Sequence, residues 1–206
     1  MVQNLKNSII LISGGMDSTT LLYEYKEHIA IGVSFNYGSK HNYREIPFAR
    51  LHCQKLGIEH RIINLDFTFL KSHLLKNQPN IPDGHYNDDV MKQTIVPFRN
   101  AIMLSYCVAL AESDNYQKVY IANHNGDHVI YPDCREDFIN AFKLASAYGT
   151  NNKIQIVAPY VKLTKRDIFV RGYGIVNYDE TYSCYKGEEK QCGTCGTCVE
   201  RLEAMG

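Results

Sequence analysis

A short glycine-containing segment near the N-terminus constrains the fold more than any other feature of this sequence. Ser13-Gly14-Gly15-Met16-Asp17-Ser18 follows an apolar run and precedes a segment in which Leu21, Leu22 and Tyr25 have helical spacing. Two glycines between a strand and a helix let the backbone approach an anion, and the N-terminus of the helix directs N–H groups at it. The segment has neither Walker A nor G-x-G-x-x-G spacing and contains no lysine. It therefore predicts a phosphate-binding loop of another type.

Strand and helix patterns alternate along the rest of the chain. The expected strands span about 8–13, 29–35, 59–65, 118–122 and 154–158, and the expected helices about 17–27, 44–56, 98–112, 135–148 and 165–171. Thr164 and Asp167 have the spacing of a capping box variant at the start of the last of these helices. Such βα units predict an α/β fold with an open, mostly parallel, Rossmann-like sheet and helices on both faces.

Charge and composition favour a compact enzyme that acts on a small molecule. The chain has 206 residues, with 22 basic and 22 acidic side chains and 45% hydrophobic residues. A formal charge of zero gives no general attraction to phosphate backbones, so we expect no nucleic-acid partner. No run approaches 18 apolar residues, and the N-terminus has no signal-like apolar region. We therefore expect a cytoplasmic protein with no membrane partner.

Four of the seven cysteines lie close together near the C-terminus. Cys184, Cys192, Cys195 and Cys198 form a C-x7-C-x2-C-x2-C pattern with no histidine nearby. Four thiolates at this spacing predict one structural zinc ion per chain. An iron–sulfur cluster is the alternative, although the C-x3-C-P element of ferredoxins is missing. We expect a nucleotide-binding and catalytic α/β domain over 1–175 and a small zinc-binding segment over 176–206 packed on it.

A polar loop follows the expected strand 118–122. It contains Asp127, Tyr131, Asp133 and Arg135. Open α/β sheets place ligands at the carboxyl ends of parallel strands. These side chains could read the hydrogen-bonding edge of a purine-like heterocycle. An ordinary polar surface loop with a turn at Pro132 is the alternative.

Taken together and in order, these motifs resemble a known enzyme family. The first loop matches the S-G-G-x-D-S loop of the PP-loop superfamily, whose members cleave ATP between its α- and β-phosphates. The whole set resembles the 7-cyano-7-deazaguanine synthases, which make preQ0 in the queuosine pathway and have an adenine nucleotide alpha hydrolase-like fold. The segments that carry the resemblance are 13–20, Asn36-Tyr37-Gly38, Pro97-Phe98-Arg99-Asn100, Gly126-Asp127-His128, 131–135 and the four cysteines.

The resemblance implies a ligase that uses ATP. The family converts 7-carboxy-7-deazaguanine and ammonia to the nitrile through an adenylated carboxylate and an amide. A carboxylate is a poor electrophile, so adenylation must first turn its oxygen into a leaving group. Mg²⁺ should accompany the ATP, bound largely through phosphates. The resemblance also implies a homodimer.

The same resemblance implies roles for individual residues. The nucleotide-binding set is Ser13, Gly14, Gly15, Met16, Asp17, Ser18 and Thr19. The catalytic set is Ser13, Asp17, Ser18, Arg99 and Lys165, and the substrate-binding set is Arg99, Asn100, Asp127, Tyr131, Asp133 and Arg135. A solvated lysine at a helix start is the alternative for Lys165. Phe98 departs from the family, which more often has glycine or another small or polar residue at this position.

Two features limit the mechanism and the alternatives. Adenylation needs no side-chain nucleophile, so we expect no covalent role for Cys134. A tRNA thiolase would predict a basic face or an RNA-binding domain, for which this chain has little room. An interaction module built on a zinc ribbon would leave the loop 13–18 unexplained. A relative that passes the activated carboxylate to another acceptor stays open.

Overall fold

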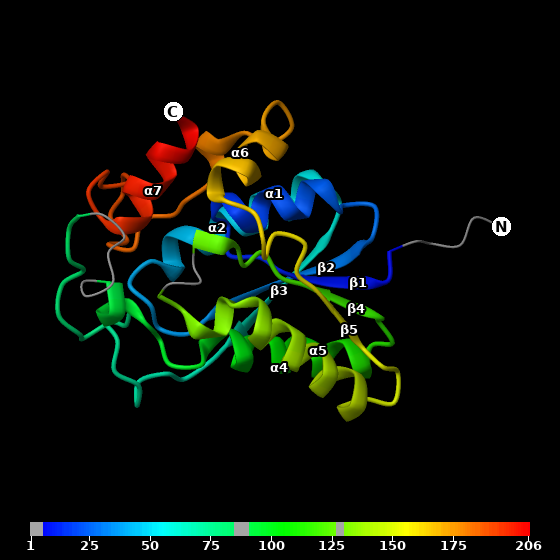
Figure 1. The fold of residues 1–206 in the computed structure, drawn as a ribbon. Coiled ribbons are helices and arrows are strands. Elements are labelled where there is room, and N and C mark those ends of the chain that lie inside the picture. Colours follow the sequence, from blue (N-terminus) through cyan, green and yellow to red (C-terminus); the bar gives the residue numbers. More distant parts are fainter. Residues whose placement is uncertain (1–5, 85–90, 127–129) are drawn as a thin grey trace.

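A five-stranded parallel sheet forms the centre of the molecule (Figure 1). The computed structural model describes residues 6–84, 91–126 and 130–206. The strand order is β3-β2-β1-β4-β5. All five strands lie where the sequence predicts them: β1 Ser8–Leu11, β2 Ile29–Asn36, β3 Glu59–Asn64, β4 Lys118–Tyr120 and β5 Gln155–Val157.

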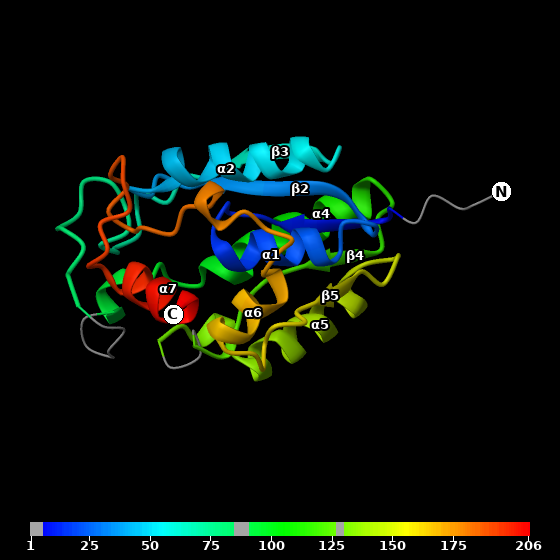
Figure 2. The ribbon, with the colours of Figure 1, turned by 90° about the horizontal axis from the view of Figure 1, so that it is seen from above.

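Helices cover both faces of this sheet, as the sequence predicts. In Figures 1 and 2, α1, α2 and α6 lie on one face, and α4 and α5 lie on the other. One further helix, α7, was not predicted, and it packs beside α6. The helices are α1 Met16–Glu24, α2 Asn42–Lys55, α4 Arg99–Ser113, α5 Glu136–Gly149, α6 Lys165–Gly172 and α7 Gly196–Met205. Short 3₁₀ turns span Lys92–Thr94, Pro132–Cys134 and Tyr178–Glu180.

The central strand β1 is buried on both faces. Ile9 packs in the cluster that includes Leu104 of α4, whereas Ile10 packs in the cluster that includes Leu21 of α1. Successive side chains of a strand point to opposite faces, so a strand between two helical layers must be apolar throughout. This burial explains the continuous apolar run that precedes the glycines.

The helix α4 is apolar because it is a core helix. Together with the turn before it, the segment Lys92–Ser113 is long and apolar enough to cross a membrane by length and composition alone. In the structure α4 packs against β1 and β4. Its buried residues include Met103, Leu104, Cys107 and Ala111. Packing on the sheet therefore accounts for its composition.

The strand order places a ligand crevice between β1 and β4. The chain runs from β1 outward to β3 on one side, then returns to β4 and runs outward to β5 on the other. In an open parallel sheet, the connections that follow the two central strands diverge at such a point and leave a crevice outside their carboxyl ends. The loop that contains Gly14 follows β1 at this edge.

The start of α6 is fixed by the predicted capping box. The Thr164 hydroxyl accepts a hydrogen bond from the Asp167 backbone N–H at 3.2 Å, and Asp167 Oδ2 accepts one from the Thr164 N–H at 2.8 Å. The two bonds satisfy N–H groups that a helix N-terminus leaves unpaired. They make Lys165 the first residue of α6.

Gly14 packs against the backbone of α2. Its φ is +96°, and a Cβ at this position would lie 2.2 Å from the carbonyl oxygen of Glu45 and 2.8 Å from the backbone nitrogen of Ala49. A side chain would be strained by the positive φ and would collide with backbone atoms that cannot rotate away. The contact therefore requires glycine.

We expect Gly14→Ala to lower the free energy of unfolding by more than about 2 kcal/mol, because it adds backbone strain and a steric clash. Urea denaturation measures the change. Gly149→Ala is the matched control, because Gly149 ends α5 with no atom within 4 Å of an added Cβ. Equal stability of the two variants would contradict the packing described here.

Candidate active site

A cavity of about 230 Å³ lies at the carboxyl ends of β1, β2 and β4. Its walls come from the loop after β1, the first turns of α2 and α4, the start of α6 and the C-terminal segment. The structure brings together here eight of the residues predicted from the sequence. They are Ser13, Gly15, Asp17, Ser18, Arg99, Asn100, Tyr131 and Lys165.

Three residues of the predicted nucleotide set do not line the cavity. Gly14 supports the loop from behind through its contact with α2. Met16 is buried in a separate cluster with Val176 and Tyr178. Thr19 is fully buried. The spacing of a loop identifies its members, but the helical turn that follows rotates some of them into the core.

The polar loop after β4 is only partly in the cavity wall. Asp133 Oδ2 accepts a hydrogen bond from the Asn100 backbone N–H at 2.8 Å, so this carboxylate caps the N-terminus of α4. Arg135 is exposed and does not line the cavity. Asp127 lies outside the described residues. Tyr131 is buried and lines the cavity, and its hydroxyl is 2.9 Å from that of Thr94.

The loop after β1 is held by its own hydroxyl groups. Ser18 Oγ accepts a hydrogen bond from the Ser13 N–H at 3.2 Å and lies 3.1 Å from Ser13 Oγ. Ser13 Oγ in turn accepts the Gly15 N–H at 3.1 Å. No side chain caps the N-terminus of α1. The electropositive end of this helix therefore faces the cavity and suits an anionic group.

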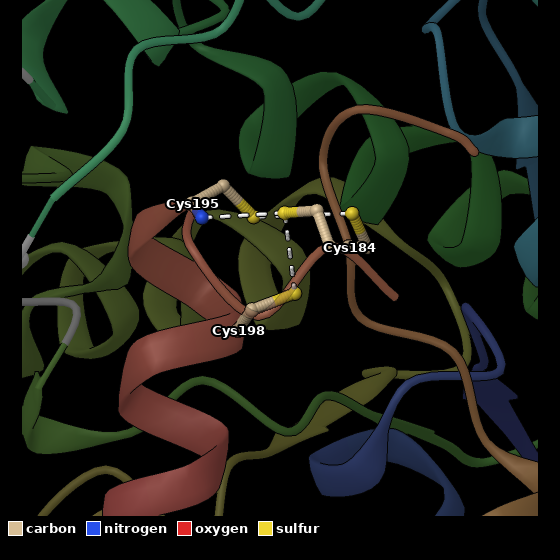
Figure 3. Close-up of side chains that lie close together, drawn as sticks. Cys184, Cys195 and Cys198 are labelled. Atoms are coloured by element: carbon tan, nitrogen blue, oxygen red, sulfur yellow. Dashed lines mark hydrogen bonds between the residues drawn. The ribbon is translucent and has the colours of Figure 1, made fainter. Parts of the chain in front are cut away.

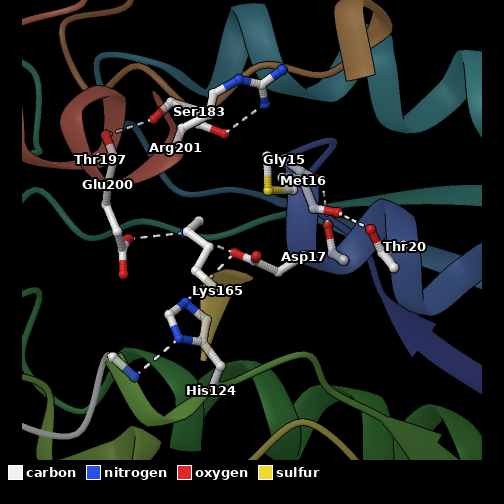
Figure 4. A network of polar contacts seen from close by, with 12 residues as sticks. Gly15, Met16, Asp17, Thr20, His124, Lys165, Ser183, Thr197, Glu200 and Arg201 are labelled. Atoms are coloured by element: carbon white, nitrogen blue, oxygen red, sulfur yellow. Dashed lines mark hydrogen bonds and ion pairs between the residues drawn. The ribbon is translucent and has the colours of Figure 1, made fainter. Parts of the chain in front are cut away.

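Asp17 is the centre of a charged network (Figure 4). Lys165 Nζ lies 3.1 Å from Asp17 Oδ2 and 3.0 Å from Glu200 Oε2, and His124 Nε2 lies 3.8 Å from Asp17 Oδ2. Burial alone would raise the pKa of Asp17, but the ammonium of Lys165 and smaller effects of His124 and Arg201 lower it below its ordinary value. Asp17 is therefore ionised at neutral pH.

Two side-chain oxygen atoms of residues that line the cavity have no hydrogen-bond partner within the described part of the chain. They are Asp17 Oδ1 and Asn123 Oδ1, and both are buried. A buried acceptor without a partner costs free energy comparable to a lost hydrogen bond. Such atoms suit a ligand that brings N–H donors or a hydrated cation.

Arg99 and Asn100 form the wall opposite the loop. The Arg99 guanidinium donates to the Tyr37 hydroxyl at 3.2 Å and lies over the Tyr37 ring. Burial opposes the charge of Arg99, but the nearby tyrosine hydroxyls, Tyr37 first, keep its pKa well above the ordinary value. Asn100 Nδ2 donates to Cys134 Sγ at 3.1 Å. This wall thus contains the fixed positive charge of Arg99, and Asn100 binds it to the loop after β4.

Sequence reasoning missed His41 and Glu45, which enter the cavity from the start of α2. Their relative exposures are 3% and 9%. Burial raises the pKa of Glu45 to about 8 and lowers that of His41 to about 3. Between these values neither is charged, so their 3.6 Å approach is a contact between neutral groups. His41, Glu45 and Ala49 are spaced four residues apart and lie on one buried face of α2. This spacing is the sequence signal that could have identified them.

The C-terminal segment closes another side of the cavity and was also missed. The Tyr182 N–H donates to the Gly14 carbonyl at 3.0 Å. Thr197 Oγ1 donates to the Ser183 carbonyl at 2.8 Å, and Arg201 donates to Thr181 Oγ1 at 2.7 Å. Ser183, Tyr185 and Thr197 line the cavity. Residues beyond 180 are therefore part of the site.

The four cysteines form a cluster at the start of α7 (Figure 3). Their sulfur atoms all lie within 4.8 Å of one another. Sγ of Cys192 is 3.9 Å from that of Cys198, and Sγ of Cys195 is 4.0 Å from that of Cys184. A tetrahedron with metal–sulfur bonds of about 2.3 Å has edges of about 3.8 Å. The donor set and its spacing therefore fit a four-thiolate metal ion.

Comparisons with solved structures show the fold alone. A U34-tRNA thiolase, NcsA, from Methanococcus maripaludis has a TM-score of 0.53 and 17% sequence identity, and the match covers 99% of this chain and 65% of that one. An NMN synthetase from Francisella tularensis has a TM-score of 0.52 and 17% identity, over 90% and 69% of the two chains.

Comparisons with whole sequences identify the family of this chain. The model of queuosine biosynthesis protein QueC matches residues 7–206. A 7-cyano-7-deazaguanine synthase of Porphyromonas gingivalis is 53% identical, and the match covers 99% of this chain and 94% of that protein. One from Caldicellulosiruptor bescii is 45% identical, over 96% and 91% of the two chains. This chain therefore belongs to the QueC family of queuosine biosynthesis proteins.

Proposed function

We propose that this enzyme converts 7-carboxy-7-deazaguanine and ammonia to 7-cyano-7-deazaguanine at the expense of ATP. The observation that carries the proposal is the cavity itself, in which the loop after β1 meets Arg99, Asn100 and Tyr131 in a chain of the QueC family. Relatives with the name 7-cyano-7-deazaguanine synthase match over nearly their whole length. The product is a 7-deazapurine of the queuosine pathway.

The first chemical step is adenylation of the substrate carboxylate. One carboxylate oxygen attacks the α-phosphorus of ATP, and the bond to the departing pyrophosphate breaks. Ser13, Ser18 and the N-terminus of α1 hold the pyrophosphate, and Lys165 and Arg99 stabilise the charge that develops on the phosphates. Asp17 keeps Lys165 in place at 3.1 Å. These groups are preorganised, so they need little rearrangement during the reaction.

Mg²⁺ would supply further charge neutralisation on the phosphates of ATP. It usually binds through phosphates, waters and one or two carboxylates. The unpartnered Oδ1 of Asp17 fits this requirement. Asp17 is also kept ionised by Lys165.

The deazaguanine ring occupies the half of the cavity near α4. We assign Arg99, Asn100 and Tyr131 to this part, with Asp133 and Arg135 on the loop beside it. Asp127, which the resemblance also assigns to the substrate, lies outside the described residues. The unpartnered Oδ1 of Asn123 suits an N–H donor of the ring or of adenine. Asp133 Oδ2 already binds the α4 N-terminus, so this assignment leaves its other oxygen for the ring.

The remaining chemistry replaces both carboxylate oxygens. Ammonia attacks the acyl carbon, AMP leaves with the first oxygen, and an amide forms. A second ATP adenylates the amide oxygen, and loss of AMP together with the remaining N–H protons gives the nitrile. Cys134 accepts a hydrogen bond from Asn100 and needs no covalent role in this sequence.

The four cysteines would hold one structural zinc ion. Zinc with four thiolates leaves no open position for substrate, so its contribution is to fold the segment that bears Ser183 and Glu200. We also propose a cytoplasmic homodimer that acts without nucleic acid or a membrane. The family resemblance supports the dimer.

We expect 7-carboxy-7-deazaguanine, ATP, Mg²⁺ and ammonium to yield first the amide and then the nitrile, detected by mass spectrometry. Lys165→Met should lower the rate by about 100-fold or more, because it removes a preorganised charge. Glu189→Gln, on the exposed surface, serves as the control. Absence of both products with the wild-type enzyme would refute the specific substrate.

We expect protein purified without added metal to contain one zinc per chain. Removal of the zinc by a chelator should lower the thermal midpoint, because metal binding contributes to folding. Elemental analysis and thermal denaturation measure the two effects. Stoichiometric iron with acid-labile sulfide would contradict the zinc assignment.

A further inference from the structure

Glu45 is a carboxyl group in the cavity that the steps above do not use. Among the described residues that line the cavity, the only carboxyl side chains are Asp17 and Glu45. Asp17 has a lysine partner at 3.1 Å. Glu45 makes no hydrogen bond through its carboxyl group in the described part of the chain, and its ion-pair-range contact is the 3.6 Å approach to His41 Nε2. Glu45 is thus a largely buried carboxyl, 9% exposed, that lines the cavity without a hydrogen bond, and such groups mark candidate functional sites.

The position of Glu45 is fixed by the backbone. Its carbonyl oxygen is the atom against which Gly14 packs, so the first turn of α2 rests directly on the nucleotide loop. The Glu45 side chain lines the same cavity as Ser13 and Ser18 of this loop. Arg99 faces it across the cavity from α4.

Within the described part of the chain, no fixed positive charge lies at hydrogen-bond distance from the Glu45 carboxyl. Its neighbour His41 is uncharged near neutral pH because burial depresses its pKa to about 3. When Glu45 ionises, a cation that enters this part of the cavity would therefore find a carboxylate whose nearest lining cation is Arg99, across the cavity on α4. The other titratable or charged groups that line the cavity include Asp17, Tyr37, Arg99, Tyr131, Lys165 and Tyr185.

The proposed reaction needs a proton acceptor at this place. The nucleophile is ammonia, but near neutral pH most of the dissolved ammonia is ammonium, which has no lone pair. Ammonium must lose a proton before it can attack the acyl adenylate. A site that bound only neutral ammonia would use a small fraction of the total dissolved ammonia and ammonium.

We propose that the Glu45 carboxylate binds ammonium in this cavity and takes one of its protons, and that the ammonia so formed attacks the adenylated carboxylate. The inference rests on the proposed function. The proton moves from nitrogen to the carboxylate, the nitrogen lone pair forms the C–N bond, and the C–O bond breaks with its electron pair on AMP. The nitrogen then releases one more proton to solvent to leave the amide.

The transfer of this proton is close to balanced in free energy. The pKa of ammonium lies between those of an α-amino group, about 7.7–8.0, and a lysine side chain, about 10.4. Burial raises the pKa of Glu45 to about 8, so the carboxyl and the ammonium ion hold their protons with similar strength. Proton transfer between groups of matched pKa is close to balanced and can run in either direction.

The test compares ammonium with hydroxylamine, which is uncharged near neutral pH and traps the same adenylate as a hydroxamate without prior loss of a proton. In Glu45→Gln, ammonium-dependent amide formation should fall by about 100-fold or more, whereas hydroxamate formation stays within about threefold of wild type. Exchange of labelled pyrophosphate into ATP with the carboxylate substrate should persist. The exposed Glu27→Gln is the matched control and should change neither product.

The possible results separate this inference from the proposed function. An equal loss of amide and hydroxamate in Glu45→Gln would overturn the inference, as would no loss of either. Wild-type enzyme that shows neither exchange nor product with 7-carboxy-7-deazaguanine would overturn the proposed function, and the inference with it. If the wild-type enzyme forms the amide, and the variant retains pyrophosphate exchange and hydroxamate formation but forms no amide, both the proposed function and the inference are supported.

The pH dependence of the wild-type enzyme provides a second measurement. It tests the inference even if the Glu45→Gln variant does not fold. The value of kcat/KM for ammonium should rise to about pH 8, where Glu45 ionises, and fall once ammonium itself loses its proton. Free ammonia as the direct substrate would instead give a plateau at high pH, which would overturn the inference.

Stability provides a readout that does not depend on activity. The folded state holds the proton of Glu45 up to about pH 8, whereas the unfolded chain releases it near the ordinary pKa of 4.5. Stability from this group is therefore lost as the pH rises between these values. Glu45→Gln should become more stable relative to wild type from about pH 5 to about pH 8. An unchanged difference would contradict the buried neutral carboxyl.

Discussion

The packing of the loop after β1 on the backbone of α2 is the contact on which the rest of the site depends. Gly14 has no Cβ, so the loop approaches the Glu45 carbonyl more closely than a side chain would allow. The same contact brings the uncharged pair His41 and Glu45 to one side of the cavity. The hydroxyl groups of the loop and a buried carboxyl thus share one cavity because two backbone segments touch.

The C-terminal segment completes the site from the other side. Its backbone binds the loop through Tyr182 and Gly14, and α7 supplies Glu200 to Lys165. Lys165 is the first residue of α6, and it lies between two carboxylates from different parts of the chain. The cysteine cluster lies at the start of α7, the helix that supplies Glu200 to Lys165, so the cluster and the charged network share one helix.

Much of the fold and part of the site could be predicted from the sequence. The five strands and the loop after β1 were found because buried parallel strands are apolar runs and glycine pairs are rare in them. The capping box at Thr164 was found because its pattern is local. α7 was missed because its segment was interpreted through its cysteines. Glu45 and Glu200 were missed because their place in the site depends on contacts between residues far apart in the chain.

Phe98 shows how a local departure can be understood only with the structure. The family more often has a glycine or another small or polar residue at this position, and here the residue has φ +56° and is 64% exposed. A left-handed conformation suits glycine and costs a bulky residue about 1 kcal/mol or more. The ring contacts Phe138 in an edge-to-face arrangement at 6.1 Å, which offsets part of that cost.

The cavity therefore has two electrostatic halves with different tasks. Around Asp17 and Lys165, charges are paired and fixed, which suits the stabilisation of phosphate charge that develops during adenylation. Around His41 and Glu45, burial lowers the pKa of the imidazole and raises that of the carboxyl, so the carboxyl has no imidazolium partner when it ionises. A charge pair at His41 and Glu45 would hold ammonium poorly, because the imidazolium would already occupy the carboxylate. The low pKa of His41 thus keeps Glu45 available, and the two halves can work in sequence on one bound substrate.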